Sequence, residues 1–253
     1  MERPFFSIVT PVFNGENFLE ETIKSVLDQD FKSFEYIIID GDSKDNTKNI
    51  IDKYKHNLAY YKSEKDNGMY DALSKGFKLC SGKYFLWINS DDFLNDRKVL
   101  SNLNKYLLKF PNIDWLVGKP SYKLNSFKNK ISFIPYHYPK WIIKNGFAFN
   151  CAWGCIQQES TIFSKKLYDL AGGIDLNYKM AGDFFLWKKF SNFSKLSIAN
   201  IKIGVHRKWS GQLQGGQHYY YQEIKRKKCF FPFMKIFRLL FSIMLYPITY
   251  YKK

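Results

Sequence analysis

Short apolar runs alternate with helical patterns along the first part of the chain. Residues 5–10 and 36–39 are apolar runs of strand length, and residues 19–27 and 50–54 place apolar side chains at helical spacing. This alternation predicts βαβ units, whose strands lie in a parallel or mixed sheet covered by helices. The expected class is therefore α/β.

Three of the predicted strands end in polar residues. Asn14 follows the first strand, Asp-Gly-Asp-Ser at 40–43 follows the second, and Asn-Ser-Asp-Asp at 89–92 follows the apolar run at 84–88. Open α/β sheets bind ligands at the carboxyl ends of their strands. We therefore expect these polar ends to meet at one ligand-binding rim.

The pair Asp91 and Asp92 is the most informative of these ends. Two adjacent carboxylates after a core strand repel each other and are costly to desolvate, so their position indicates a cation. The alternative is a solvated turn, since Asn, Ser and Asp are common turn residues. The chain has neither GxxxxGK[ST] nor GxGxxG after its first strand, which argues against a P-loop or dinucleotide enzyme. A diphosphate would then be balanced by Mg²⁺ or Mn²⁺ on oxygen ligands.

Composition constrains the partners and the compartment. The 253 residues are 45% hydrophobic, enough for a full core in one large domain, alone or with an appendage. The formal charge of +16 favours nucleic acid, an anionic lipid surface or a phosphorylated substrate as partner. The four cysteines form neither a zinc motif nor a disulfide framework, and the N-terminus lacks the regions of a signal peptide. We therefore expect a cytoplasmic protein.

The motifs at the strand ends resemble those of the inverting family 2 nucleotide-sugar glycosyltransferases, which have the GT-A fold. Residues 7–14 resemble the family's opening strand, residues 37–47 its second strand with an acid, and residues 89–92 its DxD-type element. Residues 66–76 are similar to the segment that crosses the nucleotide in many members. The resemblance implies a mixed, mostly parallel central sheet with flanking helices and a Rossmann-like nucleotide-binding half.

The resemblance also implies a division of the chain. Residues 1–218 would form the GT-A domain, with a nucleotide-sugar-binding half at 1–95 and an acceptor and catalytic half at 96–218. Residues 219–253 would form a separate basic and aromatic tail.

Donor-binding roles fall mainly in the first half. By the resemblance, Pro11 and Phe13 would border the base, and Glu16 would support that loop. Asp40 would hydrogen-bond the base. Each of the last three has a structural alternative: Phe13 in the core, Glu16 as a helix-start acid, and Asp40 as the cap of a turn.

The nucleotide-crossing segment departs from the family pattern. The usual Arg-Asn pair is replaced by Leu-Ser, so Lys75 would supply the charge for a phosphate. Asp66 and Asp71 would contact donor hydroxyls or the base. The alternative for these three side chains is an exposed helix face.

The DxD-type element and a late loop supply the expected metal and phosphate contacts. The resemblance makes Asp92 a metal ligand, while Asp91 would face the ribose or share the metal. The first carboxylate of the common pattern is Asn89 here, whose amide still accepts hydrogen bonds. Arg207 would reach a donor phosphate, and His206 is either a metal ligand or a packed or surface side chain. The expected cofactor is Mn²⁺ or Mg²⁺.

The candidate catalytic residue is Asp183. Residues 181–187 resemble the family's acidic catalytic motif, but its usual Glu-Asp pair reads Gly182-Asp183. Direct displacement at an anomeric carbon needs a carboxylate that takes the proton of the acceptor hydroxyl, so the resemblance implies Asp183 as the general base. The alternative is an N-cap of the helix that follows.

The composition of the predicted tail at 219–253 differs from that of the preceding chain. A basic cluster at 225–228 precedes an apolar segment with Lys235 and Arg238 on one polar stripe, which predicts an amphipathic helix in an anionic membrane interface. A transmembrane span would need about twenty apolar residues, and the two cations interrupt the run. Docking on the catalytic domain is a further alternative.

Together these features predict an inverting glycosyltransferase. The resemblance implies a nucleotide-sugar donor, with UDP as the nucleotide because it is common in the family. It also implies a lipid-linked saccharide acceptor in bacterial surface polysaccharide assembly. The enzyme would work as a peripheral protein at the inner face of the cell membrane. The alternatives are a catalytically idle membrane scaffold of the same fold and a basic nucleic-acid-binding protein. No nucleic-acid partner is expected, because the sequence contains no recognised binding motif.

Overall fold

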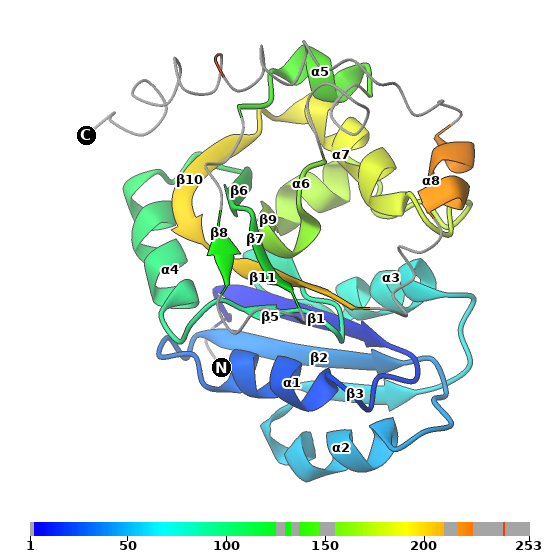
Figure 1. Cartoon of the computed structure of the whole chain (residues 1–253). Coiled ribbons are helices and arrows are strands. Elements are labelled where there is room, and N and C mark those ends of the chain that lie inside the picture. The colour runs from blue at the N-terminus through cyan, green and yellow to red at the C-terminus, as the bar shows by residue number, and fades with distance from the viewer. Residues whose placement is uncertain are drawn as a thin grey trace.

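A seven-stranded sheet forms the centre of the molecule, in the order β10-β6-β9-β4-β1-β2-β3 (Figure 1). The structure, a computed structural model, describes residues 3–124, 130–132, 137–146, 155–209, 217–224 and 240. β9 runs antiparallel to β4 and β6, and the other neighbouring pairs are parallel. The mixed, mostly parallel sheet expected from the sequence is confirmed. Its strands are β1 (Phe6–Val12), β2 (Phe34–Asp40), β3 (Tyr60–Ser63), β4 (Tyr84–Trp87), β6 (Trp115–Lys119), β9 (Thr161–Ser164) and β10 (Ser197–Lys202).

Helices cover the two faces of this sheet in separate layers. The apolar core on one face contains buried residues of α1, α2 and α4, and the core on the other face contains those of α3, α5, α6 and α7. All residues of β1 are buried, because a central strand covered on both faces reads as a continuous apolar run. The helices are α1 (Leu19–Leu27), α2 (Thr47–Tyr54), α3 (Met69–Leu79), α4 (Val99–Lys109), α5 (Lys140–Lys144), α6 (Lys165–Leu170), α7 (Gly182–Phe193) and α8 (Gln217–Glu223), with 3-10 turns η1 (Lys55–Asn57) and η2 (Gln158–Ser160).

A second, smaller sheet brings distant parts of the chain to the acidic turn. Its order is β5-β11-β7-β8. Phe93, directly after the acidic turn, pairs with Val205 in an antiparallel arrangement. β11, which comes late in the chain, therefore pairs with β5, the short strand that follows the acidic turn. The strands of this sheet are β5 (Phe93–Leu94), β7 (Ser121–Leu124), β8 (Ile131–Ser132) and β11 (Gly204–Lys208).

Helix α8 lies across the boundary that the sequence placed at residue 218. Its Glu223 accepts hydrogen bonds from the backbone N–H groups of Lys179, Met180 and Ala181, at 2.8, 2.9 and 2.8 Å. Ile224 is buried in a cluster with Ala181 and Phe184. The end of α8 thus packs on the start of α7, across the expected boundary.

The predicted membrane-associating segment follows α8. The basic cluster at 225–228 and the amphipathic stretch with Lys235 and Arg238 lie outside the described residues, so the membrane contact stays a prediction. Within the part of the chain that the structure describes, no helix combines the length and the apolar character that a membrane crossing needs.

Candidate active site

The loops after β1 and β2 are joined by hydrogen bonds between side chains and backbone. The Asn14 N–H donates to Ser43 Oγ at 2.8 Å, and Asn14 Oδ1 accepts from the Lys44 N–H at 2.9 Å. Glu16 Oε2 accepts from the Asn46 N–H at 2.9 Å. Two of the predicted polar ends therefore form one rim, and Glu16 supports it from the first loop.

Asp40 organises the end of β2. Its side chain is fully buried, and its carboxylate accepts from the Ser43 N–H at 3.2 Å and from Ser63 Oγ at 2.5 Å. Asp66 lies against Gly41, the residue after Asp40: a Cβ on Gly41 would lie 2.7 Å from Asp66 Oδ2. Burial raises the pKa of Asp66. The structure thus brings Asp40 and Asp66 to one place, and their contacts with a base stay a prediction.

The other donor-binding candidates lie in different surroundings. Pro11 is buried within β1, whereas Phe13 is 62% exposed, which contradicts a core role for Phe13. Lys75 Nζ lies 3.1 Å from Glu64 and 3.3 Å from Asp71. These ions pair on the surface of α3, and the predicted phosphate contact of Lys75 remains to be tested.

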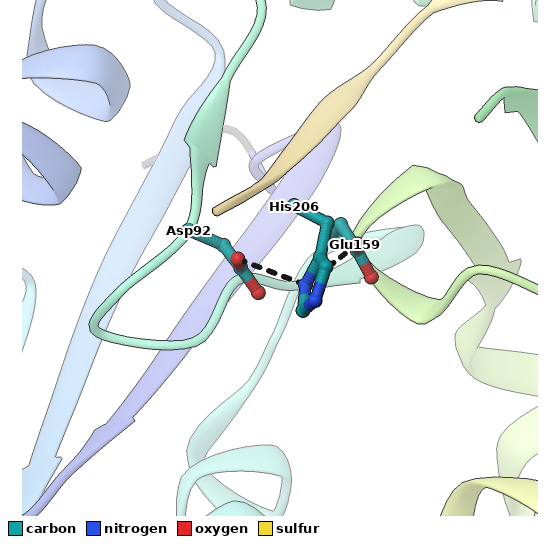
Figure 2. A group of neighbouring side chains, drawn as sticks. All are labelled: Asp92, Glu159 and His206. Carbon is teal, nitrogen blue, oxygen red and sulfur yellow. Dashed lines mark ion pairs between the residues drawn. The ribbon is translucent and has the colours of Figure 1, made fainter. Parts of the chain in front are cut away.

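The acidic turn after β4 meets two residues from later in the chain. Figure 2 shows the His206 ring between the carboxylates of Asp92 and Glu159. His206 Nδ1 lies 3.2 Å from Asp92 Oδ1 and 3.3 Å from Glu159 Oε1. All three side chains are buried, and Asp92 has no exposed surface. We call Asp92, Glu159 and His206 the acidic cluster.

The acidic cluster requires a positive charge. Burial raises the pKa of Glu159 to about 8 and also raises that of Asp92, despite the opposing effect of His206. Burial would lower the pKa of His206, but the Glu159 and Asp92 carboxylates outweigh it and raise this pKa to about 9. Two carboxylates taken out of water are stable only with a proton or a cation between them.

The same three side chains fit a divalent cation. Each offers a ligand atom, and these atoms lie within 4.8 Å of one another. Two carboxylates and an imidazole suit Mn²⁺, and the oxygen ligands suit Mg²⁺. His206 Nε2 is buried and has no hydrogen-bond partner in the part of the chain that the structure describes, so this nitrogen could bind a further group. His206 therefore lies within a possible cation site, as one of its two interpretations from the sequence expects.

Glu159 was missed as a member of this cluster. It lies in η2, which leads directly into β9. Its neighbour Gln158 has a buried amide whose nitrogen and oxygen both lack a hydrogen-bond partner among the described residues. The one sequence signal was an acid directly before a buried apolar strand, where an unpaired charge is costly.

Asp91 and Arg207 have hydrogen-bond partners outside the acidic cluster. Asp91 Oδ2 accepts from Trp209 Nε1 at 2.9 Å, and Arg207 Nε donates to the Asp91 carbonyl at 3.0 Å. The Arg207 guanidinium also contacts Glu21 and lies 4.6 Å from the centre of the Phe18 ring. Successive side chains of a strand point to opposite faces, so His206 and Arg207 lie on opposite faces of β11. The structure groups Asp92, not Asp91, with the other possible cation ligands.

Arg207 is 4% exposed, and its backbone N–H donates to Asp92 Oδ1 at 3.0 Å. The residue therefore fixes the acidic turn through both its backbone and its side chain. The phosphate contact predicted for Arg207 stays untested, and its guanidinium already has anionic and carbonyl partners.

Asp183 lies in the first turn of α7. The N-cap of this helix is Ala181, so the alternative of Asp183 as N-cap is wrong. Asp183 Oδ1 lies 3.0 Å from the Tyr220 hydroxyl and 3.4 Å from that of Tyr70. The surrounding protein desolvates the carboxyl group and raises the pKa of Asp183 to about 6, although hydrogen bonds oppose this shift.

A chain of contacts connects Asp183 to the acidic cluster. The ring of Tyr70, a neighbour of Asp183, packs edge-on against Trp87 at 5.8 Å. Trp87 Nε1 donates to Asn89 Oδ1 at 2.7 Å, and Asn89 Nδ2 donates to Asp92 Oδ2 at 3.4 Å. Asn89 accepts and donates at once, which an ionised Asp does not do. This explains an amide at the first position of the DxD-type element.

Comparison with known proteins identifies the family of this chain. The sequence model of Glycosyl transferase family 2 matches residues 7–168. The chain belongs to this family. An uncharacterized glycosyltransferase of Rickettsia typhi is 30% identical over 222 residues, which are 80% of this chain and 64% of the relative. A PGL/p-HBAD biosynthesis glycosyltransferase of Mycobacterium bovis is 24% identical and covers 76% of this chain and 72% of its own length.

Solved structures share the fold of this chain. S. aureus TarS 1–349, in complex with UDP-GlcNAc, has a TM-score of 0.69 at 20% identity, covering 86% of this chain and 63% of its own. A mannosyltransferase of Pyrobaculum calidifontis, in complex with GDP-Man and Mn²⁺, has a TM-score of 0.64 at 15% identity, covering 96% and 70%. The predicted GT-A fold is confirmed. This chain spans somewhat less than two thirds of the length of the Rickettsia relative and of TarS.

The position of Glu159 depends on Gly204. A Cβ at residue 204 would lie 2.0 Å from the Glu159 carbonyl oxygen, a contact that only backbone movement relieves. We expect Gly204→Ala to lower the free energy of unfolding by about 1 to 3 kcal/mol, measured by urea denaturation. Lys105→Ala, on the exposed face of α4, is the control and should change it by less than about 0.5 kcal/mol. Equal stability of the two variants would contradict this close packing.

Proposed function

We propose that this chain is a metal-dependent, inverting glycosyltransferase that moves a sugar from a nucleotide-diphosphate donor to a hydroxyl of a saccharide. The observation that carries the proposal is the contact chain between a cluster that fits a divalent cation and one isolated carboxylate, Asp183. A cation site and a single base are what direct displacement at an anomeric carbon requires.

Asp183 acts as the base in this proposal. The acceptor hydroxyl gives its proton to the Asp183 carboxylate while its oxygen forms a bond to the anomeric carbon. The bond from that carbon to the diphosphate breaks on the opposite side, and the nucleotide diphosphate leaves with the electron pair. The configuration inverts, and no covalent enzyme intermediate forms.

The acidic cluster serves the departing diphosphate. Asp92, Glu159 and His206 would hold Mn²⁺ or Mg²⁺, which offsets the charge that develops on the leaving group. Asn89 and Arg207 orient the Asp92 carboxylate for this task.

We also infer the donor, the acceptor and the cellular location of the enzyme. A UDP-sugar is the favoured donor, supported by the similarity to TarS, which was crystallised with UDP-GlcNAc. A lipid-linked saccharide of the cell surface is the favoured acceptor, supported by the PGL/p-HBAD biosynthesis relative. The basic and aromatic segment after α8 would hold the enzyme on the anionic inner face of the membrane.

Removal of the base should separate catalysis from binding. Asp183→Asn keeps the size of the side chain but cannot take a proton, so we expect kcat to fall by about 10²-fold to 10⁴-fold. The affinity for UDP with Mn²⁺, measured by calorimetry, should stay within about twofold. Asp169→Asn, the same change at an exposed position of α6, is the control. Unchanged turnover in Asp183→Asn would exclude Asp183 as the base.

The pH profile should report the ionisation of Asp183. Its pKa is raised from 3.8 to about 6, and the base must be ionised to accept a proton. We therefore expect kcat to fall tenfold per pH unit below about pH 6. The measurement is single-turnover transfer between pH 4.5 and 8, with folding followed by circular dichroism. A flat profile across pH 5 to 6 in folded protein would contradict this assignment.

The acidic cluster should control metal-dependent nucleotide binding. Calorimetric titration with UDP, GDP, dTDP and CMP, with and without Mn²⁺, should find one nucleotide whose binding needs the metal. Asp92→Asn and Glu159→Gln each remove one anionic ligand and should weaken that binding by at least about tenfold. Asp52→Asn on the exposed face of α2 is the control. Metal-independent binding of equal strength in all variants would refute the cation site.

A further inference from the structure

Helix α8 is anchored at the amino end of α7 by a carboxylate. Glu223 Oε1 accepts from the Lys179 N–H, and Oε2 accepts from the Met180 and Ala181 N–H groups. These three N–H groups belong to the N-cap of α7 and to the two residues before it, and the helix dipole favours a negative charge near the amino end of a helix. Glu223 is therefore both a hydrogen-bond acceptor and a matched charge for the start of α7.

The anchored helix presents a phenol to Asp183. Tyr220 lies one turn before Glu223 on α8, and its hydroxyl is 3.0 Å from Asp183 Oδ1. An ionised carboxylate only accepts hydrogen bonds, so the phenol donates. Ile224 closes the apolar contact beneath, against Ala181 and Phe184.

The hydroxyl of Tyr70, the second tyrosine near Asp183, has several hydrogen-bond partners. The Tyr70 hydroxyl lies 3.0 Å from the Met180 carbonyl and 3.4 Å from Asp183 Oδ1, and it accepts from the Asp183 N–H at 3.3 Å. A tyrosine has one proton to donate, and the shorter contact is to Met180. Tyr220 is thus the closer and better placed donor to the Asp183 carboxylate.

The Tyr70 ring also explains the residue before Asp183. A Cβ at Gly182 would lie 2.8 to 2.9 Å from carbons of that ring, so no side chain fits there. The supporting acid that the family pattern has at this position is absent, and two phenols surround the carboxylate in its place.

We propose that α8 is a positioning element for the catalytic base: Glu223 fixes the segment that leads into α7, and Tyr220 holds Oδ1 of Asp183 so that Oδ2 receives the acceptor proton. This inference rests on the proposed function of Asp183. Tyr220 and Glu223 act through Asp183 and touch no substrate. Among the residues that the structure describes, the charged and titratable groups near Asp183 and Tyr220 include Tyr70 on α3, Glu223 on α8, Lys188 on α7, which lines the same small pocket, and Cys155.

Hydrogen exchange of the full-length protein tests the anchor independently of activity. In Glu223→Gln one oxygen becomes an NH₂ group, which cannot accept from the backbone. We expect the amides of residues 179–181 to exchange at least about tenfold faster than in the wild type. Asp52→Asn, with the same change of charge on α2, should leave them unchanged. Equal protection in Glu223→Gln and the wild type would overturn the anchor.

Removal of the Tyr220 hydroxyl tests the positioning of the base. Tyr220→Phe loses a hydrogen bond that favours the ionised carboxylate, so the titration of Asp183 should move up by about one pH unit. The carboxyl ¹³C resonance of Asp183, assigned by its absence in Asp183→Asn, gives this titration without turnover. We also expect kcat to fall about tenfold to 100-fold, with KM for the donor within about twofold. Tyr219→Phe, at a residue that is 63% exposed, is the control.

The two measurements separate failure of the inference from failure of the function. A titration of Asp183 that does not move in Tyr220→Phe, or an unchanged kcat in that variant, would overturn the positioning role. Absence of turnover by the wild type with every donor would instead refute the proposed function, while the exchange and titration results would still decide whether α8 positions Asp183.

Discussion

Two buried carboxylates that share one imidazole set the main constraint on this molecule. Asp92 and Glu159 approach the same nitrogen of His206 within 3.2 and 3.3 Å, out of contact with water. Such a group is stable only when a proton or a cation balances it. The three residues come from the turn after β4, from η2 and from β11, so the two sheets must keep their relative positions for the charges to stay balanced.

Two of the departures from the family pattern are matched by contacts elsewhere in the fold. Asn89 in the DxD-type element connects Trp87 to Asp92 by donating and accepting at once. Gly182, in place of an acid, makes room for the ring of Tyr70. Asn89 and Gly182 both contact the chain of side chains that connects Asp92 to Asp183. We infer that the two replacements of acids are structurally related and that neither is a simple loss of function.

Several acids of this basic chain hold backbone in place. Glu16 fixes the loop after β2, Asp40 fixes the end of β2 itself, and Glu223 fixes the start of α7. A carboxylate that accepts backbone N–H groups forms stronger hydrogen bonds than a neutral side chain does. Each of these acids holds a segment that lies next to the rim or next to Asp183. The geometry of the site and its local stability therefore depend on the same side chains.

The sequence by itself determined the α/β class, the strands that end in polar residues and the position of Asp92 after a buried strand. These features follow from local periodicity, because apolar runs and turn residues carry their signal within a few positions. Tertiary structure alone decided that Glu159 and His206 join Asp92, that the Arg207 side chain has its partners outside this cluster, and that α8 belongs with Asp183. Those groupings depend on strand register and on the packing of segments far apart in the chain, and a single-residue change of register would reverse which side chain of β11 faces the cluster.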